Sequence, residues 1–177
     1  MNRKICCALI GQRPMRFRFG WDEEDEACIK LKLVLLQQIQ KLIRSGVTQF
    51  MTACDPGVGL WCSEIINVLR DGDDDLHLYC ALPHEEQSTK WAPYLRERYF
   101  EMLEKCTYMS AVSKHKTSAS QIDAYKYIID QSDIVLAVYD SASARGDDED
   151  KAMGTMPRRK SARRCLFTRT RLKSVLL

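Results

Sequence analysis

The chain has 177 residues, of which 45% are hydrophobic and 29% charged, and its formal net charge at pH 7 is +3. This length suits one domain, and a globular composition excludes a chain that is disordered throughout. No apolar run reaches the roughly 18 residues that a membrane-spanning helix needs. The apolar run 5–10 ends at Gly11 without a small-residue cleavage site, so it predicts a first strand rather than a signal peptide.

Strands and helices alternate along the chain. Buried-type apolar runs predict strands over 4–10, 48–54, 76–82, 107–112 and 133–139, with Pro83 ending the third. Apolar residues at helical spacing predict helices over 22–44, 59–69, 85–105 and 118–131, with a break in the third at Pro93. This β-α order predicts an α/β fold with a Rossmann-like, mainly parallel sheet of about five strands and helices on both faces.

The last part of the chain differs in charge from the rest. Residues 151–177 carry nine Lys and Arg and no acidic residue, whereas 1–150 carry 18 basic and 24 acidic residues. We therefore expect a domain over 1–156 and a basic tail over 157–177. The tail is not expected to build a regular last βα unit, although 165–167 could form a short edge strand. A changed reading frame or divergent end, a nucleic-acid-binding tail and a solvated charged end without a role remain three alternatives.

Eight cysteines occur mostly inside apolar stretches, and they form no CxxC pair. This placement indicates small buried hydrophobic side chains in a reducing compartment, so we expect a cytoplasmic protein without a disulfide framework. We expect no metal site, because His77, His84 and His115 show no ligand spacing.

Ligands of open parallel sheets bind beyond the carboxyl ends of the strands, so the loops there should carry the chemistry. After the first strand, Arg13 places a guanidinium beside the Gly11 turn, where it suits a phosphate or carboxylate. After the second strand, the turn 55–59 can present backbone amides to an anion. A surface arginine and an ordinary tight turn explain these two loops equally well.

Two further loops extend this edge. The third loop, 83–91, surrounds Trp91 with polar groups that could contact a nucleobase or ribose, or it could simply cap a helix start. The fourth follows Asp140 and reaches Gly154 and Thr155, where a second phosphate cradle could form. Trp61, after the second loop, could belong to the core or stack on a base.

Three motifs make a family resemblance specific. Residues 17–25 are Phe-Arg-Phe-Gly-Trp-Asp-Glu-Glu-Asp, residues 52–64 are Thr-Ala-Cys-Asp-Pro-Gly-Val-Gly-Leu-Trp-Cys-Ser-Glu, and 83–91 holds Pro, Glu, Gln and Trp at the spacing Pro-x-x-Glu-Gln-x-x-x-Trp. Together with Gly-Gln-Arg-Pro at 11–14, they resemble the YpsA-like family of the SLOG superfamily over roughly residues 4–155. That superfamily is related to DprA and to the Lonely Guy phosphoribohydrolases.

The resemblance implies a Rossmann-like domain that binds a nucleotide-derived small molecule, related to ADP-ribose, and acts as a sensor or regulator. In Bacillus-type relatives it also implies a link to cell division, and a homo-oligomer would fit the family. No cofactor beyond that ligand and no membrane contact are implied. The site residues expected on these grounds are Gly11, Arg13, Gly57, Trp61, Glu64, Glu86, Trp91, Asp140, Gly154 and Thr155.

The chain departs from the family pattern at three loop positions. Gln12 stands in place of a histidine, Ala53 in place of the first loop glycine, and Gly59 in place of the loop acid, which would contact a ribose hydroxyl or a water. Two other functions stay open. N-glycosidic hydrolysis, as in the Lonely Guy relatives, would need a carboxylate such as Glu64 or Glu86. Single-stranded nucleic-acid binding, as in DprA, would rely on the basic tail.

Overall fold

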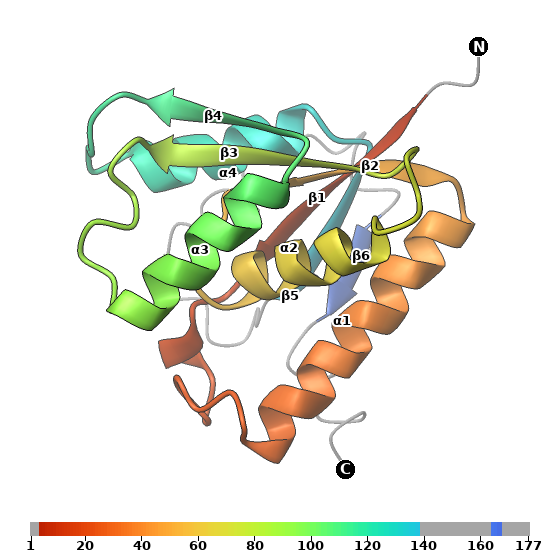
Figure 1. The fold of residues 1–177 in the computed structure, drawn as a ribbon. Helices are drawn as coiled ribbons and strands as arrows, with labels where there is room; N and C mark the ends of the chain where they lie inside the picture. Colours follow the sequence, from red (N-terminus) through yellow and green to blue (C-terminus); the bar gives the residue numbers. More distant parts are fainter. Residues whose placement is uncertain (1–3, 139–163, 168–177) are drawn as a thin grey trace.

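The computed structural model describes residues 4–138 and 164–167 (Figure 1). Its six strands form one sheet in which all neighbours are parallel, in the order β4-β3-β2-β1-β5-β6. The strands are β1 (Ile5–Gly11), β2 (Val47–Thr52), β3 (His77–His84), β4 (Tyr108–Ser113), β5 (Ile134–Val138) and β6 (Arg164–Phe167). The helices are a short 3-10 turn η1 (Pro14–Arg16), α1 (Glu26–Arg44), α2 (Val58–Leu69), α3 (Pro93–Lys105) and α4 (Ser120–Asp130).

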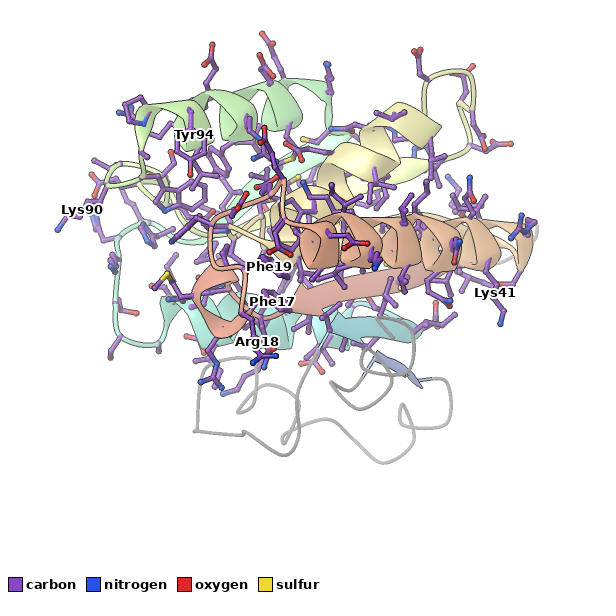
Figure 2. The ribbon with its side chains drawn as sticks, turned by 90° about the horizontal axis from the view of Figure 1, so that it is seen from below. Phe17, Arg18, Phe19, Lys41, Lys90 and Tyr94 are labelled. Carbon is purple, nitrogen blue, oxygen red and sulfur yellow. The ribbon has the colours of Figure 1, made fainter. Side chains whose placement is uncertain are left out.

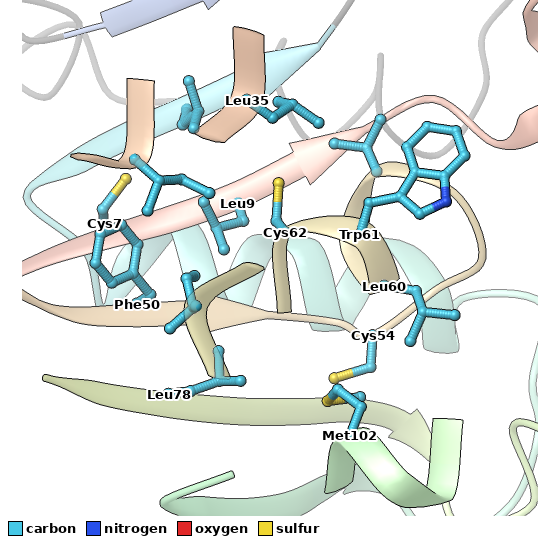
Figure 3. Close-up of a cluster of buried hydrophobic side chains, with 14 of the residues drawn as sticks. Cys7, Leu9, Leu35, Phe50, Cys54, Leu60, Trp61, Cys62, Leu78 and Met102 are labelled. Atoms are coloured by element: carbon cyan, nitrogen blue, oxygen red, sulfur yellow. The ribbon is translucent and has the colours of Figure 1, made fainter. Parts of the chain in front are cut away.

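Side-chain alternation along the buried strands separates two hydrophobic cores. On β1, Cys7 and Leu9 join the side chains of α1, α2 and α3 on one face, whereas Ala8 and Ile10 join those of α4 on the other. Figure 3 shows part of the first core, with Leu35 of α1 and Cys62 of α2 gathered over β1. The predicted Rossmann-like α/β architecture is therefore confirmed, with helices on both faces of a parallel sheet.

Two element boundaries differ from the expectation for local reasons. The helix expected from residue 22 begins at Glu26, because the Asp25 carboxylate caps it by accepting the N–H of Ala27 at 2.7 Å. The third strand continues through Pro83, although that residue was expected to end it. Pairing of β3 with β2 stops at Cys80, so the missing N–H of Pro83 does not interrupt that ladder.

The region 85–105 was expected to be helical with a break at Pro93. Residues 85–92 instead form turns, and α3 starts at Pro93, the first position of a helix, where a missing N–H is tolerated. The sheet also has a sixth strand, beyond the five or so expected. Arg164–Phe167 is an edge strand parallel to β5, at the place where a short edge strand was considered. The rest of the tail, 157–163 and 168–177, lies outside the described residues.

Among the described helices, none combines the length and the apolar character that a membrane-spanning segment requires.

Candidate functional site

A pocket of about 820 Å³ lies at the carboxyl edge of the sheet, over β1 to β4. This volume falls in the range of small-molecule sites. Segments that follow these four strands line it, and Trp21 adds one further side chain. Residues 12–16 follow β1, and Asp55 and Pro56 follow β2. The third segment contributes Pro83, His84, Gln87 and Trp91, and the fourth, after β4, contributes Lys116, Thr117, Ser118, Ser120 and Gln121. The loop after β5 lies outside the described residues.

The loops after β1 and β4 bring basic and hydroxyl side chains to the pocket. Arg13 and Arg16 come from the first loop, and Lys116 and Thr117 come from the other. A hydroxyl group orders the loop after β4, because the Ser120 Oγ accepts a hydrogen bond from the N–H of Thr117 at 2.8 Å. The pocket wall therefore combines positive charge with hydrogen-bonding groups, a combination that suits a phosphate.

Asp55 supplies a buried carboxyl group to the pocket wall. Its side chain follows β2 and is only 3% exposed, and the phenol Oη of Tyr125 donates a hydrogen bond to its Oδ2 at 2.9 Å. Burial raises the pKa of Asp55 to about 6, against the opposing effects of the Tyr125 hydrogen bond, a backbone N–H and the nearby charge of Arg13. A carboxyl group with this pKa in a pocket is a candidate functional group.

Two glycines allow the loop after β2 to pack this closely. Gly57 has a φ of 90°, and a Cβ added to it would lie 2.9 Å from Cδ of Pro14. A Cβ on Gly59 would lie 3.0 Å from Oδ1 of Asp55 and 3.4 Å from Oγ1 of Thr52. Gly59, where the resemblance implied an acid, therefore leaves space beside the carboxyl group of Asp55.

The segment after β3 contributes an aromatic side chain and a buried imidazole. Trp91 packs edge-on against Tyr99, with ring centroids 5.0 Å apart, and lines the pocket. Gln87 is fixed at both ends of its amide, since it donates to the carbonyl of Ala53 at 3.0 Å and accepts from Tyr99 at 3.2 Å. Burial, with Lys116 nearby, lowers the pKa of His84 and so favours the neutral imidazole.

Of the expected site residues, Arg13 and Trp91 line this pocket. Gly11 and Gly57 lie at the same edge of the sheet without lining it. Gly11 is the last residue of β1, and a Cβ there would lie 2.3 Å from the Cβ of Val58. Both glycines therefore serve the close packing of the loops that form the pocket.

Trp61 and the two expected glutamates lie away from the pocket wall. Trp61 is 2% exposed in the core and packs against Phe17 and Phe19, each with ring centroids 6.2 Å from its own. Figure 2 shows both phenylalanines beside the start of α1. Glu64 is held by Arg98, and Glu86 is exposed in the turn after β3. Asp140, Gly154 and Thr155 lie outside the described residues.

Arg98 connects the start of α1 to α2 through two glutamates. Its guanidinium donates to both carboxylate oxygens of Glu64, at 2.9 and 2.8 Å, and to Glu23 at 2.8 Å. Lys32 completes the network by pairing with Glu23. Burial alone would raise the pKa of Glu23, but hydrogen bonds from Arg98 and Lys32 lower it to about 2. Glu64 and Glu23 are therefore structural ion-pair partners.

The sequence reasoning did not select Asp55, His84 or the segment 116–121 as site residues. Their positions in the sequence could have identified them, because each lies at or just beyond the end of a predicted strand, where ligands of parallel sheets bind. Among the described residues, no cluster of three or more His, Cys, Asp or Glu side chains is arranged to hold a metal ion.

Comparison with known proteins places the chain in a family. A profile of the YspA SLOG family, YpsA, matches residues 7–162. A UPF0398 protein of Halalkalibacterium halodurans is 29% identical over 112 residues, which cover 62% of this chain and 59% of that protein. A UPF0398 protein of Bacillus thuringiensis strain Al Hakam is 26% identical over 136 residues, which cover 75% and 73%. The chain therefore belongs to the YpsA family of SLOG proteins.

Proposed function

We propose that the pocket binds a nucleotide-derived small molecule, of the class of ADP or ADP-ribose, and that the protein is a sensor or regulator of that molecule. The observation that carries the proposal is the composition of the pocket lining. Arg13, Arg16 and Lys116 supply positive charge for phosphates, while Trp91 and Trp21 supply aromatic side chains for a base. A link to cell division, as in Bacillus-type relatives, belongs to the same proposal.

The position of the pocket supports the same class of ligand. Parallel sheets bind ligands outside the carboxyl ends of their strands, and this pocket lies over four such ends. Its volume of about 820 Å³ is sufficient for a dinucleotide-sized molecule.

The test is binding measured by isothermal titration calorimetry with ADP and ADP-ribose, beside mass spectrometry of small molecules released from the purified full chain. We expect saturable binding of at least one of these ligands, or a co-purified nucleotide. Arg18→Ala is a matched control for variants of Arg13, because Arg18 is an exposed arginine on the same connection that does not line the pocket (Figure 2). Absence of binding and of any co-purified nucleotide would contradict the proposal.

A second candidate is hydrolysis of an N-glycosidic bond, and Asp55 is the observation that favours it. General acids and bases act best with a pKa near the working pH, and the pKa of this carboxyl group is raised to about 6. Neither Glu64 nor Glu86 lines the pocket, so neither is placed for this role. Release of adenine from AMP or ADP-ribose, followed by chromatography with Asp55→Asn as the control, tests this candidate.

A further inference from the structure

One edge of the sheet is formed by β4, at the side farthest from β6 (Figure 1). Its neighbour in the sheet is β3, and no strand of the described residues pairs with its other side. Tyr108 and Met109 of this strand are 61% and 53% exposed, so the edge also presents large apolar side chains. An exposed edge with these properties is a template for a further strand.

A groove of about 640 Å³ lies between β4 and α3, and we call it the α3–β4 groove. Three apolar and three acidic side chains line it: Phe100, Leu103, Met109, Glu97, Glu101 and Glu104. The glutamates are exposed and follow one another at spacings of four and three residues, so they share one face of α3. Within the part of the chain that the structure describes, none of the three is paired with a basic side chain.

The acidic side chains of the groove determine which strand fits beside β4. If the β4 strands of two copies paired antiparallel, both α3 helices would lie on one face of the joined sheet. Their glutamates would then repel each other, so a second β4 is an unfavourable partner. A basic segment is favoured instead, because its charge is complementary to that of the groove.

The chain contains such a segment directly after β6. Residues 169–173 are Arg-Thr-Arg-Leu-Lys, with a basic residue at every second position. In an extended strand these basic side chains point to the same side at intervals of about 6.6 Å. Glu97 and Glu101 are separated by about 6 Å along the axis of α3, so the two spacings match.

This segment cannot reach the α3–β4 groove of its own molecule. The two edge strands are five strand spacings apart, which is about 24 Å. Arg169 and Arg171 follow the end of β6 at Phe167 by two and four residues, which span at most about 7 and 14 Å. The groove that the segment can enter is therefore that of another copy.

We propose that the α3–β4 groove binds residues 169–173 of a second copy of this chain, as a strand added to the open side of β4. The basic side chains lie against the three glutamates, and their alkyl stems cover part of the exposed ring of Phe100. This inference does not use the nucleotide pocket, so it can fail while the proposed function holds, and the reverse is also true.

The experiment measures self-association of the full chain by sedimentation velocity over a range of concentrations at low and high salt. We expect association that strengthens with concentration and weakens with salt. Glu101→Lys and Arg171→Glu should each weaken it by about tenfold, because each replaces an attraction by a repulsion. A chain that carries both changes regains the pair with reversed charges, so its association should return to within about threefold of the unmodified protein.

Two control variants make the same charge changes elsewhere, and both should leave the association unaltered. Asp74→Lys changes an exposed acid in the turn after α2, and Arg159→Glu changes a basic residue of the tail outside the segment. Hydrogen exchange of 108–113 should slow at concentrations where the copies associate, and circular dichroism checks the fold of each variant.

A full chain that stays monomeric at all concentrations would overturn the proposal. Association that survives Arg171→Glu unchanged would overturn the segment 169–173 as the occupant. If Glu101→Lys strengthened that association, the β4 edge of a second copy would be the occupant instead.

Discussion

Two carboxyl regions of the molecule differ in kind: the partly exposed pair Glu23 and Glu64, and the buried Asp55 just before α2. Glu23 and Glu64 share the guanidinium of Arg98, and the pKa of Glu23 falls to about 2. Asp55 accepts a hydrogen bond from the phenol of Tyr125, and burial raises its pKa to about 6. The ion pairs of the first region stabilise the ionised carboxylates, whereas burial disfavours the ionised form of Asp55.

Asp55→Asn should give the largest effect and should increase stability. Because the pKa of Asp55 is raised in the fold, its ionisation destabilises the native state as the pH rises from about 4 through 6. The variant should match the unmodified protein to within about 1 kcal/mol at pH 4 and exceed it by about 3 kcal/mol at pH 8. Urea unfolding across this pH range measures the difference. The exposed Asp71→Asn is the control, and parallel pH profiles would contradict the assignment.

Arg98→Ala should give the opposite sign. The substitution leaves Glu23 and Glu64 without the guanidinium that carries three charge-assisted hydrogen bonds, so we expect a loss of about 2–3 kcal/mol at pH 7. The pKa of Glu23 is lowered in the fold, so the loss should be complete above about pH 5 and shrink as the pH falls towards 2. Arg96→Ala, an exposed change on the same helix, should leave the stability unaltered.

Arg13→Ala should change ligand affinity rather than stability, which distinguishes the pocket from the ion-pair network of Arg98. We expect the affinity for ADP to weaken by about 1.5–3 kcal/mol, the range for hydrogen bonds to charged groups, with little effect on unfolding. Calorimetry beside Arg18→Ala provides the measurement. Unchanged affinity in Arg13→Ala would assign that side chain a structural role.

A chain ending at Met156 should show the smallest effect. It lacks β6, a four-residue edge strand with β5 as its partner in the sheet, so we expect its Tm to fall by about 4 °C or less. Both carboxylate regions should keep their pH dependence, which urea unfolding at pH 4 and pH 8 checks. A large loss of Tm at both low and high salt would show that the tail is part of the core. Steeply salt-dependent nucleic-acid binding by the full chain would support a different role for it.

The architecture followed from the sequence because its signals are local. Continuous apolar runs placed five strands, and the 3.6-residue spacing placed the helices between them. The errors lie where a neighbouring strand decides the outcome. At Pro83, pairing with β2 has already stopped at Cys80, and pairing with β4 continues to His84 on either side of the proline. The signal for β6 was weak because its apolar residues, 165–167, are flanked by the basic residues Arg163, Arg164 and Arg169.

The site was less predictable because its properties depend on distant partners. Arg13 and Trp91 could be selected from loop positions alone. The hydrogen bond to the carboxyl group of Asp55, in contrast, comes from Tyr125, 70 residues further along the chain. Trp61 was left open between core and ligand contact. The stacked pair of Phe17 and Phe19, with ring centroids 4.9 Å apart, packs against it, and no sequence spacing predicts that contact.

The buried cysteines can serve as natural probes of local unfolding. Six buried thiols are spread over β1, α1, α2, β3 and the turn after β2: Cys6, Cys7, Cys28, Cys54, Cys62 and Cys80. Burial raises the pKa of Cys62 to about 12, and only the thiolate reacts readily with alkylating reagents. Each of these sulfur atoms is therefore labelled only when its own part of the fold opens. Labelling rates resolved by peptide mass spectrometry would thus map the free energy of local opening across both sides of the sheet, without a single introduced probe.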